Sequence, residues 1–278
     1  MKYKLIALDL DGTLLNDDKK ITEINKNTLQ KLIQSGYEIV IATGRRYSTA
    51  KRFVEVVDKN LVILANNGNI VRNIKDDKVL LKKYLDIDDF HTLIREGKKK
   101  GLYPIIHSDY FDEGYDILIE LDVNDRKYSN YLTGSIDGYK RVEDFMKIED
   151  PRALTVVYLG DKDKLESFNL EVNTKYPDKY SSHVMENITI AGALLEVMHP
   201  LGSKWLSLEE YSKEKGISKE EIIAIGDDNN DIEMIKQAGL GIAMKNASLG
   251  VKNVADIITE KDNNEDGVAH ILKEVLKI

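Results

Sequence analysis

The chain has 278 residues, of which 42% are hydrophobic and 32% are charged, and its formal net charge is -8. This composition suits a globular protein of one large or two modest domains. The acidity disfavours general binding to nucleic acid or anionic membranes, both of which require clustered cations. The chain contains no cysteine, which excludes disulfides, thiolate metal sites and cysteine nucleophiles. Because neither a signal peptide nor a membrane-spanning apolar stretch is evident, we expect a cytoplasmic protein, with a monomer as the default.

The N-terminal part of the chain alternates short apolar runs with helical patterns. Apolar runs at 4–9, 37–42 and 61–65 predict buried strands, and the patterns at 22–35 and 47–57 predict helices between them. The order β-α-β-α-β is typical of a parallel sheet with right-handed crossovers.

The same alternation returns near the C-terminus. Helices are expected at 204–215, at about 231–238 and from about residue 266, with strands at 222–225 and 239–243. These segments therefore continue the parallel sheet that the N-terminal part begins.

The middle of the chain differs, because tyrosines and turns are frequent and the expected strands look less buried. There we expect helices at 86–100 and 162–176, and strands at 103–107, 116–120, 154–158 and 188–197. The sequence therefore predicts an α/β fold with a Rossmann-like parallel-sheet core at 1–83 and 197–278. An inserted α+β cap domain is predicted at 84–196.

Polar side chains follow four of the predicted core strands. In an open parallel sheet, ligands gather at the carboxyl ends of the strands, near a point where the strand order reverses. We therefore expect one cluster formed by Asp9 and Asp11 after the first strand, Thr43, Gly44 and Arg45 after the second, Asn67 after the third, and Asp227, Asn230 and Asp231 after the strand at 222–225.

These residue types suit phosphoryl transfer. A dianionic phosphate ester repels a carboxylate nucleophile, and a divalent cation between the two removes that repulsion. Mg²⁺ prefers hard oxygen ligands, which Asp9 and Asp227 could supply together with a backbone carbonyl. Thr43 and the amide of Gly44 could hold phosphate oxygens, and Lys204 could add a positive charge.

Four segments resemble the motifs of the haloacid dehalogenase superfamily. They are residues 9–15, 43–45, Lys204 and 226–231, in the order of the family's first to fourth motif. The resemblance is closest to the Cof-type sugar-phosphatase branch, subclass IIB, which carries a large cap inserted between the second and third motifs. The segment 264–269 also resembles that branch. Trp205 departs from the family pattern, which usually has glycine after the motif lysine.

The resemblance implies a role for each acid and for the lysine. Asp9 would be the nucleophile and a magnesium ligand. Asp11 would act as general acid and base and would bind the metal through its backbone carbonyl. Asp227 would be the second acidic ligand, and Lys204 would stabilise the phosphate and orient Asp9. Asp231 would support either the metal shell or Lys204.

The resemblance also implies a set of phosphate-binding groups. Thr43, Gly44 and Asn230 would hold the phosphate beside Lys204. For Arg45 two readings stay open, contact with the substrate or an ion pair at the surface. An ordinary cap or turn role is the alternative for Thr43, Asn230 and Asp231.

The function expected from this set is hydrolysis of small phosphorylated metabolites, such as sugar phosphates, by a Mg²⁺-dependent phosphatase through a phospho-aspartate. Two alternatives use the same groups. A phosphotransferase or phosphomutase would return the phosphate to a sugar, and a non-catalytic switch would keep the phospho-aspartate for a partner to read. The sequence does not select a substrate.

Overall fold

The computed structural model describes residues 2–128, 131–132, 138–187 and 192–278. The chain forms two compact units, Met1–Lys82 with Ser203–Ile278 and Lys83–Gly202. The second unit is thus one continuous segment inserted into the first. Among the described residues, no helix has both the length and the apolar composition that crossing a membrane requires.

The first unit is built on an eight-stranded sheet, counted over the described residues, with the order β14-β13-β12-β1-β2-β3-β4-β5. The strands from β14 to β3 are parallel, and β4 and β5 add antiparallel pairs at one edge. This arrangement confirms the predicted α/β fold with a parallel-sheet core. The strands are β1 (Leu5–Leu8), β2 (Glu38–Ala42), β3 (Val62–Ala65), β4 (Ile70–Asn73), β5 (Val79–Lys82), β12 (Ile222–Gly226), β13 (Leu240–Ala243) and β14 (Ile257–Ile258).

The central position of β1 places the polar strand ends together. Leu8 pairs in register with Ile41 of β2 on one side and with Ile225 of β12 on the other. The chain order reverses here, since β2 and β12 come from opposite ends of the sequence. The residues that follow β1, β2 and β12 therefore leave the sheet at one edge, as expected for a doubly wound sheet.

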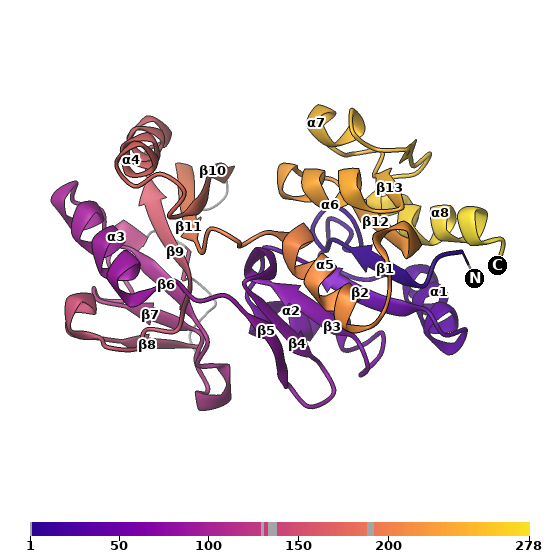
Figure 1. The fold of residues 1–278 in the computed structure, drawn as a ribbon, viewed down its shortest axis with the longest axis horizontal. Coiled ribbons are helices and arrows are strands. Elements are labelled where there is room, and N and C mark those ends of the chain that lie inside the picture. The colour runs from indigo at the N-terminus through magenta and orange to yellow at the C-terminus, as the bar shows by residue number, and fades with distance from the viewer. Residues whose placement is uncertain (1, 129–130, 133–137, 188–191) are drawn as a thin grey trace. The chain divides into compact units, whose positions relative to one another are not determined.

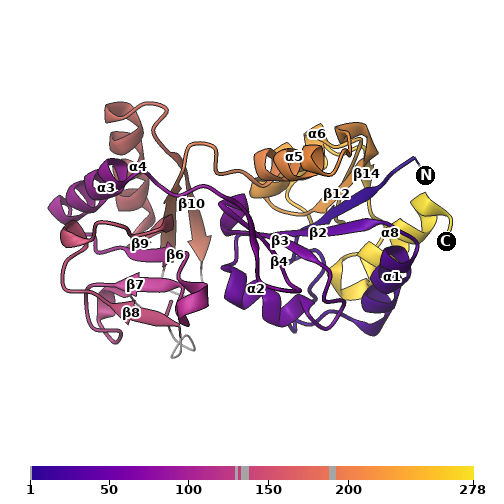
Figure 2. The ribbon, with the colours of Figure 1, turned by 60° about the horizontal axis from the view of Figure 1, so that its bottom comes forward.

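Helices cover both faces of this sheet. On one face, Trp205 and Leu208 pack with alternate strand residues such as Ala7 and Ala224. Figure 2 shows α5 and α6 on that face and α1, α2 and α8 on the other. The helices are α1 (Glu23–Gln34), α2 (Tyr47–Val54), α5 (Lys204–Glu214), α6 (Ile232–Gln237), α7 (Leu249–Lys252) and α8 (Gly267–Leu276).

The second unit has a mixed sheet with the order β10-β11-β9-β6-β7-β8. Phe90 and Leu93 of α3 and Phe168 of α4 pack against one face of it. Figure 1 shows α3 and α4 on the same side of this sheet. Its elements are α3 (Ile87–Lys99), β6 (Ile105–Ser108), β7 (Ile117–Ile119), β8 (Tyr139–Arg141), β9 (Ala153–Gly160), α4 (Lys162–Lys175), β10 (Ser181–Asn187) and β11 (Gly192–Met198).

Several elements differ from the sequence-based expectation, among them β8, β10 and α7, which were not predicted. The strand expected at 188–197 corresponds to β11, which runs to Met198 because it pairs with β9 and β10 that far; residues 188–191 lie outside the described part. The hairpin of β4 and β5 was not predicted, because Arg72 and the charged residues around its turn break the apolar pattern. Arg72 is buried there, and its guanidinium donates to the carbonyl of Asp77.

Candidate active site

A buried lysine joins two of the acidic loops. Nζ of Lys204 lies 2.7 Å from Oδ1 of Asp9 and 2.7 Å from Oδ1 of Asp231. Lys204 is 1% exposed, so both ion pairs are shielded from water. The start of α5 fixes the lysine, because the side chain of Ser203 caps the helix by accepting from the next backbone amides.

Asp227 completes a group of three carboxylates. Oxygen atoms of Asp9, Asp227 and Asp231 all lie within 4.8 Å of one another, which is close enough for a shared cation. The hydroxyl of Thr13 donates to Oδ1 of Asp227 at 2.7 Å and orients it. Gly12 has φ +78, and any Cβ at this position would collide with the Asp227 carboxylate. Glycine is therefore required where the loop after β1 meets the loop after β12.

The charges of this group are unbalanced. Burial raises the pKa of Asp9 well above its ordinary value, although the ammonium of Lys204 acts in the opposite direction. Burial likewise raises the pKa of Asp227 to about 7, against the hydrogen bond from Thr13. Burial would lower the pKa of Lys204, but Asp231 and Asp9 together raise it. Three carboxylates share one ammonium, and a divalent cation would supply the missing positive charge.

Asp231 differs from the other two acids because protein groups already engage both of its oxygens. Oδ1 accepts from Lys204, and Oδ2 accepts from the backbone amides of Asp227 and Asp228 at 3.0 and 3.2 Å. These bonds close the turn that carries Asp227. Asp228 is exposed, and its side chain caps the short helix Asn229–Asp231.

Asp11 forms ion pairs with two cations. Nε of Arg45 lies 2.5 Å from Oδ2 of Asp11, and Nζ of Lys19 lies 2.8 Å from Oδ1. Burial would raise the pKa of Asp11, but the hydrogen bonds from Arg45 and then Lys19 outweigh it and lower the pKa to about 2. Asp11 is therefore ionised here. Of the two readings left open for Arg45, the structure shows an ion pair, and its partner is Asp11.

The remaining predicted polar groups gather beside these loops. Nδ2 of Asn230 donates to Oδ1 of Asn67 at 3.0 Å, and a Cβ added at Gly44 would lie within 3.8 Å of both side-chain amides. Thr43 is 1% exposed, its carbonyl accepts from the Asn67 amide, and its hydroxyl accepts from the amide of Arg45. Loops after β2, β3 and β12 thus meet through polar contacts.

Sequence reasoning missed several residues that contact this site. Thr13 and Lys19 contact Asp227 and Asp11, and only their closeness in sequence to the first acidic motif could have indicated it. Trp205, the departure from the family pattern, packs into the core beneath α5 and is 4% exposed. It removes no polar group from the site.

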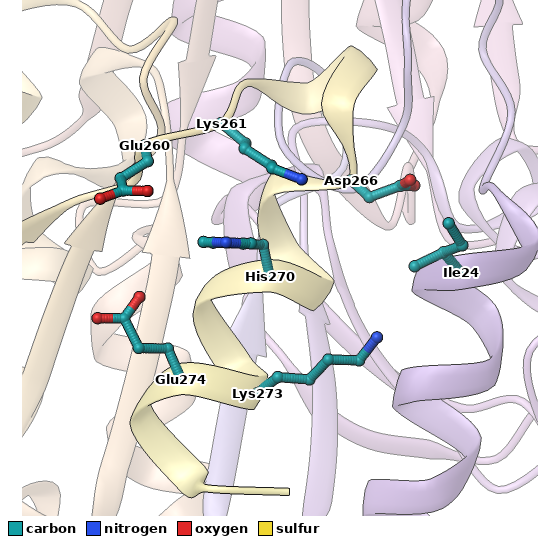
Figure 3. Close-up of a pocket in the computed structure, with 7 residues that line it drawn as sticks. All are labelled: Ile24, Glu260, Lys261, Asp266, His270, Lys273 and Glu274. Atoms are coloured by element: carbon teal, nitrogen blue, oxygen red, sulfur yellow. The ribbon is translucent and has the colours of Figure 1, made fainter.

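A pocket elsewhere in the first unit contains none of the predicted site residues. It lies between α1 and α8, and Figure 3 shows that charged side chains surround it. The lining residues are Ile24, Glu260, Lys261, Asp266, His270, Lys273 and Glu274.

Comparison with known proteins places the chain in a family. The profile of the haloacid dehalogenase-like hydrolases matches residues 6–272. The chain is 30% identical to the 5-amino-6-(5-phospho-D-ribitylamino)uracil phosphatase YitU of Bacillus subtilis, over 100% of this chain and 99% of the relative. It is 25% identical to the phosphatase YwpJ of the same organism, over 98% of this chain and 100% of the relative.

A solved structure supports the same assignment. The haloacid dehalogenase-like hydrolase from Bacteroides thetaiotaomicron is 30% identical, with a TM-score of 0.83, over 99% of this chain and 100% of that one. The chain therefore belongs to the haloacid dehalogenase-like hydrolases, which confirms the predicted resemblance to that superfamily and its Cof-type branch.

The buried lysine gives a first prediction. Lys204→Met should lower the free energy of unfolding by about 3 kcal/mol, because it leaves buried carboxylates without their counter-ion. Lys213→Met, the same change at an exposed position of α5 where the lysine pairs with Glu209, should cost less than about 0.5 kcal/mol. Urea unfolding measures both, and equal losses would show that the Lys204 pairs contribute nothing particular.

The close approach at Gly12 gives a second prediction. Gly216 also has positive φ, at +68, but nothing lies within 4 Å of the Cβ that would be added there. Gly216→Ala should therefore cost only the backbone strain, about 1 kcal/mol. Gly12→Ala should cost about 2 kcal/mol more, because the methyl group displaces Asp227. Thermal unfolding compares the two variants, and a Gly12→Ala loss no larger than the control would contradict the packing shown.

Proposed function

We propose that the protein is a Mg²⁺-dependent phosphatase that hydrolyses phosphate monoesters of small metabolites through a phospho-aspartate at Asp9. The observation that carries the proposal is the buried group in which Lys204 holds Asp9 and Asp231 while an Asp227 oxygen lies within 4.8 Å of both acids. A structural ion pair needs no third carboxylate. An excess of buried negative charge suits a site that receives a cation together with a phosphate.

The donor set fits magnesium. Carboxylate oxygens of Asp9 and Asp227, with the backbone carbonyl of Asp11, would hold the ion, and Asp231 would support them through Lys204 and the backbone. When bound, the ion would offset the repulsion between the phosphate and the carboxylate nucleophile. With Lys204 on Oδ1 of Asp9, the other carboxylate oxygen would face the phosphorus.

The reaction divides into two displacements at phosphorus. In the first, an Asp9 oxygen forms a bond to phosphorus, the bond to the leaving oxygen breaks, and Asp11 gives that oxygen a proton. In the second, Asp11 takes a proton from water, and the water oxygen attacks the phosphorus. The bond between phosphorus and Asp9 then breaks, which releases orthophosphate and restores the carboxylate.

The ion pair of Asp11 suits the second displacement directly, because an ionised carboxylate accepts the proton of water. The first displacement requires the protonated form. A substrate phosphate would compete with Asp11 for the guanidinium of Arg45, since both anions accept its paired donors. Loss of that partner would remove the main factor that lowers the pKa of Asp11, so binding of the correct ligand would prepare the acid.

Further groups would hold the phosphate. Thr43, the amide of Gly44 and the amide side chain of Asn230 would contact its oxygens beside Lys204, and Arg45 would join them on leaving Asp11. The contacts among Gly44, Asn67 and Asn230 support this, because they bring three loops into one polar group.

The expected substrate class is a small phosphorylated metabolite. A relative is named for a phosphorylated ribityl compound, which is consistent with a polyol or sugar-like leaving group. The inserted unit, residues 83–202, would act as the cap domain that selects the leaving group, while the first unit carries the chemistry.

The nucleophile gives the first test of this function. Release of orthophosphate from para-nitrophenyl phosphate with Mg²⁺ should fall at least ~1,000-fold in Asp9→Asn, because the amide cannot form the phosphoenzyme. Asp18→Asn, the same change at an exposed residue nearby, should retain full activity. Undiminished turnover in Asp9→Asn would refute the proposal, and formation of a sugar bisphosphate in place of orthophosphate would favour a phosphotransferase.

The metal site gives the second test. Saturating Mg²⁺ should raise the Tm of the protein by about 5 °C, since a ligand bound only by the folded state stabilises it. Asp227→Asn should abolish this shift without lowering the Tm measured in EDTA, because burial already disfavours the charged form of Asp227. Asp228→Asn, the adjacent exposed acid, serves as the control and should keep the shift. A shift retained by Asp227→Asn would exclude that residue as a ligand.

A further inference from the structure

One loop contacts the two loops that carry the acidic residues of the candidate site, which follow β1 and β12. The loop between β13 and α7 binds the fourth motif through its backbone, because the amide of Ser248 donates to the Asp227 carbonyl at 2.9 Å. The same loop reaches the first motif through a side chain, since Nδ2 of Asn246 donates to the carbonyl of Gly12 at 2.7 Å. It therefore links the two segments whose separation sets the width of the proposed metal site.

A second hydrogen bond fixes the orientation of the side-chain amide of Asn246. The backbone amide of Asn263 donates to Oδ1 of Asn246 at 3.4 Å, which directs Nδ2 of Asn246 toward Gly12. Asn263 is 4% exposed, and its own Nδ2 donates to the Leu15 carbonyl at 3.0 Å and to Oδ1 of Asp17 at 3.1 Å. The two asparagines thus bind the first acidic loop on either side of Thr13 and Leu14.

The first acidic loop gains from such outside contacts because its backbone is irregular. Gly12 has φ +78, and the Leu15 amide returns to the Leu10 carbonyl at 2.8 Å to close a tight turn. Backbone carbonyls in such a turn have no regular ladder of partners, so side-chain donors satisfy them instead. The turn lies directly against Asp227, where a small displacement would change the spacing of the acids.

We propose that Asn246 and Asn263 are positioning residues that hold the turn at Asp11 and Gly12 against Asp227. Neither touches the reacting groups; they act through the backbone carbonyls of Gly12 and Leu15. The inference rests on the proposed function, because the geometry that they set is that of the magnesium site. The two asparagines supply neutral donors here without adding charge to an already acidic site.

This assignment also accounts for the C-terminal segment at 264–269, which the catalytic roles do not use. Both polar side-chain atoms of Asn264 bind Asp17, at 3.0 and 3.1 Å. Asp266 accepts from the hydroxyl of Thr22, and Figure 3 shows Asp266 at the start of α8, beside α1. The Ala269 amide donates to the side chain of Asn25 at 2.9 Å. The whole segment therefore secures the chain that follows β1.

The test compares Asn246→Ala with Lys245→Ala, its exposed neighbour, whose side chain pairs only with Glu265 among the contacts described. In Asn246→Ala the Mg²⁺ concentration for half-maximal thermal shift should rise about 5–10-fold, as expected for one lost hydrogen bond that sets ligand geometry. The kcat should fall by a similar factor, KM should stay within about twofold, and the Tm in EDTA should match the control.

Asn263→Ala should likewise raise the Mg²⁺ concentration for half-maximal thermal shift and lower the kcat. It should also lower the Tm in EDTA, because the buried Leu15 carbonyl loses its side-chain donor. An active wild type with an Asn246→Ala protein that matches Lys245→Ala in Mg²⁺ response and kcat would overturn the inference alone. A wild type with neither phosphatase activity nor a Mg²⁺ shift would overturn the proposed function and the inference with it.

Discussion

The structure of the site depends on one buried ammonium group placed between two carboxylates. Without Lys204, the ends of β1 and β12 would place Asp9 and Asp231 together in a region that excludes water, at a high electrostatic cost. The lysine offsets only part of the charge, because Asp227 adds a third carboxylate. The parallel sheet sets this arrangement, since its strand order reverses at β1. The fold thus creates a local excess of negative charge that a structural ion pair would not require.

Much of the core and the acidic cluster could be predicted because their signals are local in sequence. A short apolar run followed by Asp9 and Asp11, or by Asp227 and Asp231, indicates both a buried strand and a polar group at its end. Strand order then places those ends on one edge, and the parallel pairs of β1 with β2 and β12 show it. Lys204 lies on a helix instead, and only its family motif indicated that it would reach the same point.

Other features could not be predicted because they depend on partners far apart in the chain. Nothing in the sequence pairs Arg45 with Asp11, since both are compatible with solvent until the loops after β1 and β2 meet. The hairpin of β4 and β5 could not be predicted because an arginine such as Arg72 is expected to be exposed. In the structure, its guanidinium lies over the ring of Tyr47 and donates to a backbone carbonyl. Asn246 and Asn263 leave no pattern, because their acceptors are carbonyls that any residue would provide.

Ion pairs and neutral amide hydrogen bonds have different physical consequences for a phosphatase. Charged pairs such as Arg45 with Asp11 can exchange partners when an anion arrives, because a phosphate offers the guanidinium an equivalent acceptor. Neutral amide bonds to backbone carbonyls gain nothing from such an exchange, so they hold the loop while the charges rearrange. The proposed function, in which the site accepts a cation and a dianion in turn, would need both kinds of contact. In that proposal the acids and cations would carry the chemistry, and Asn246 and Asn263 would keep the acids at a separation that the chemistry can use.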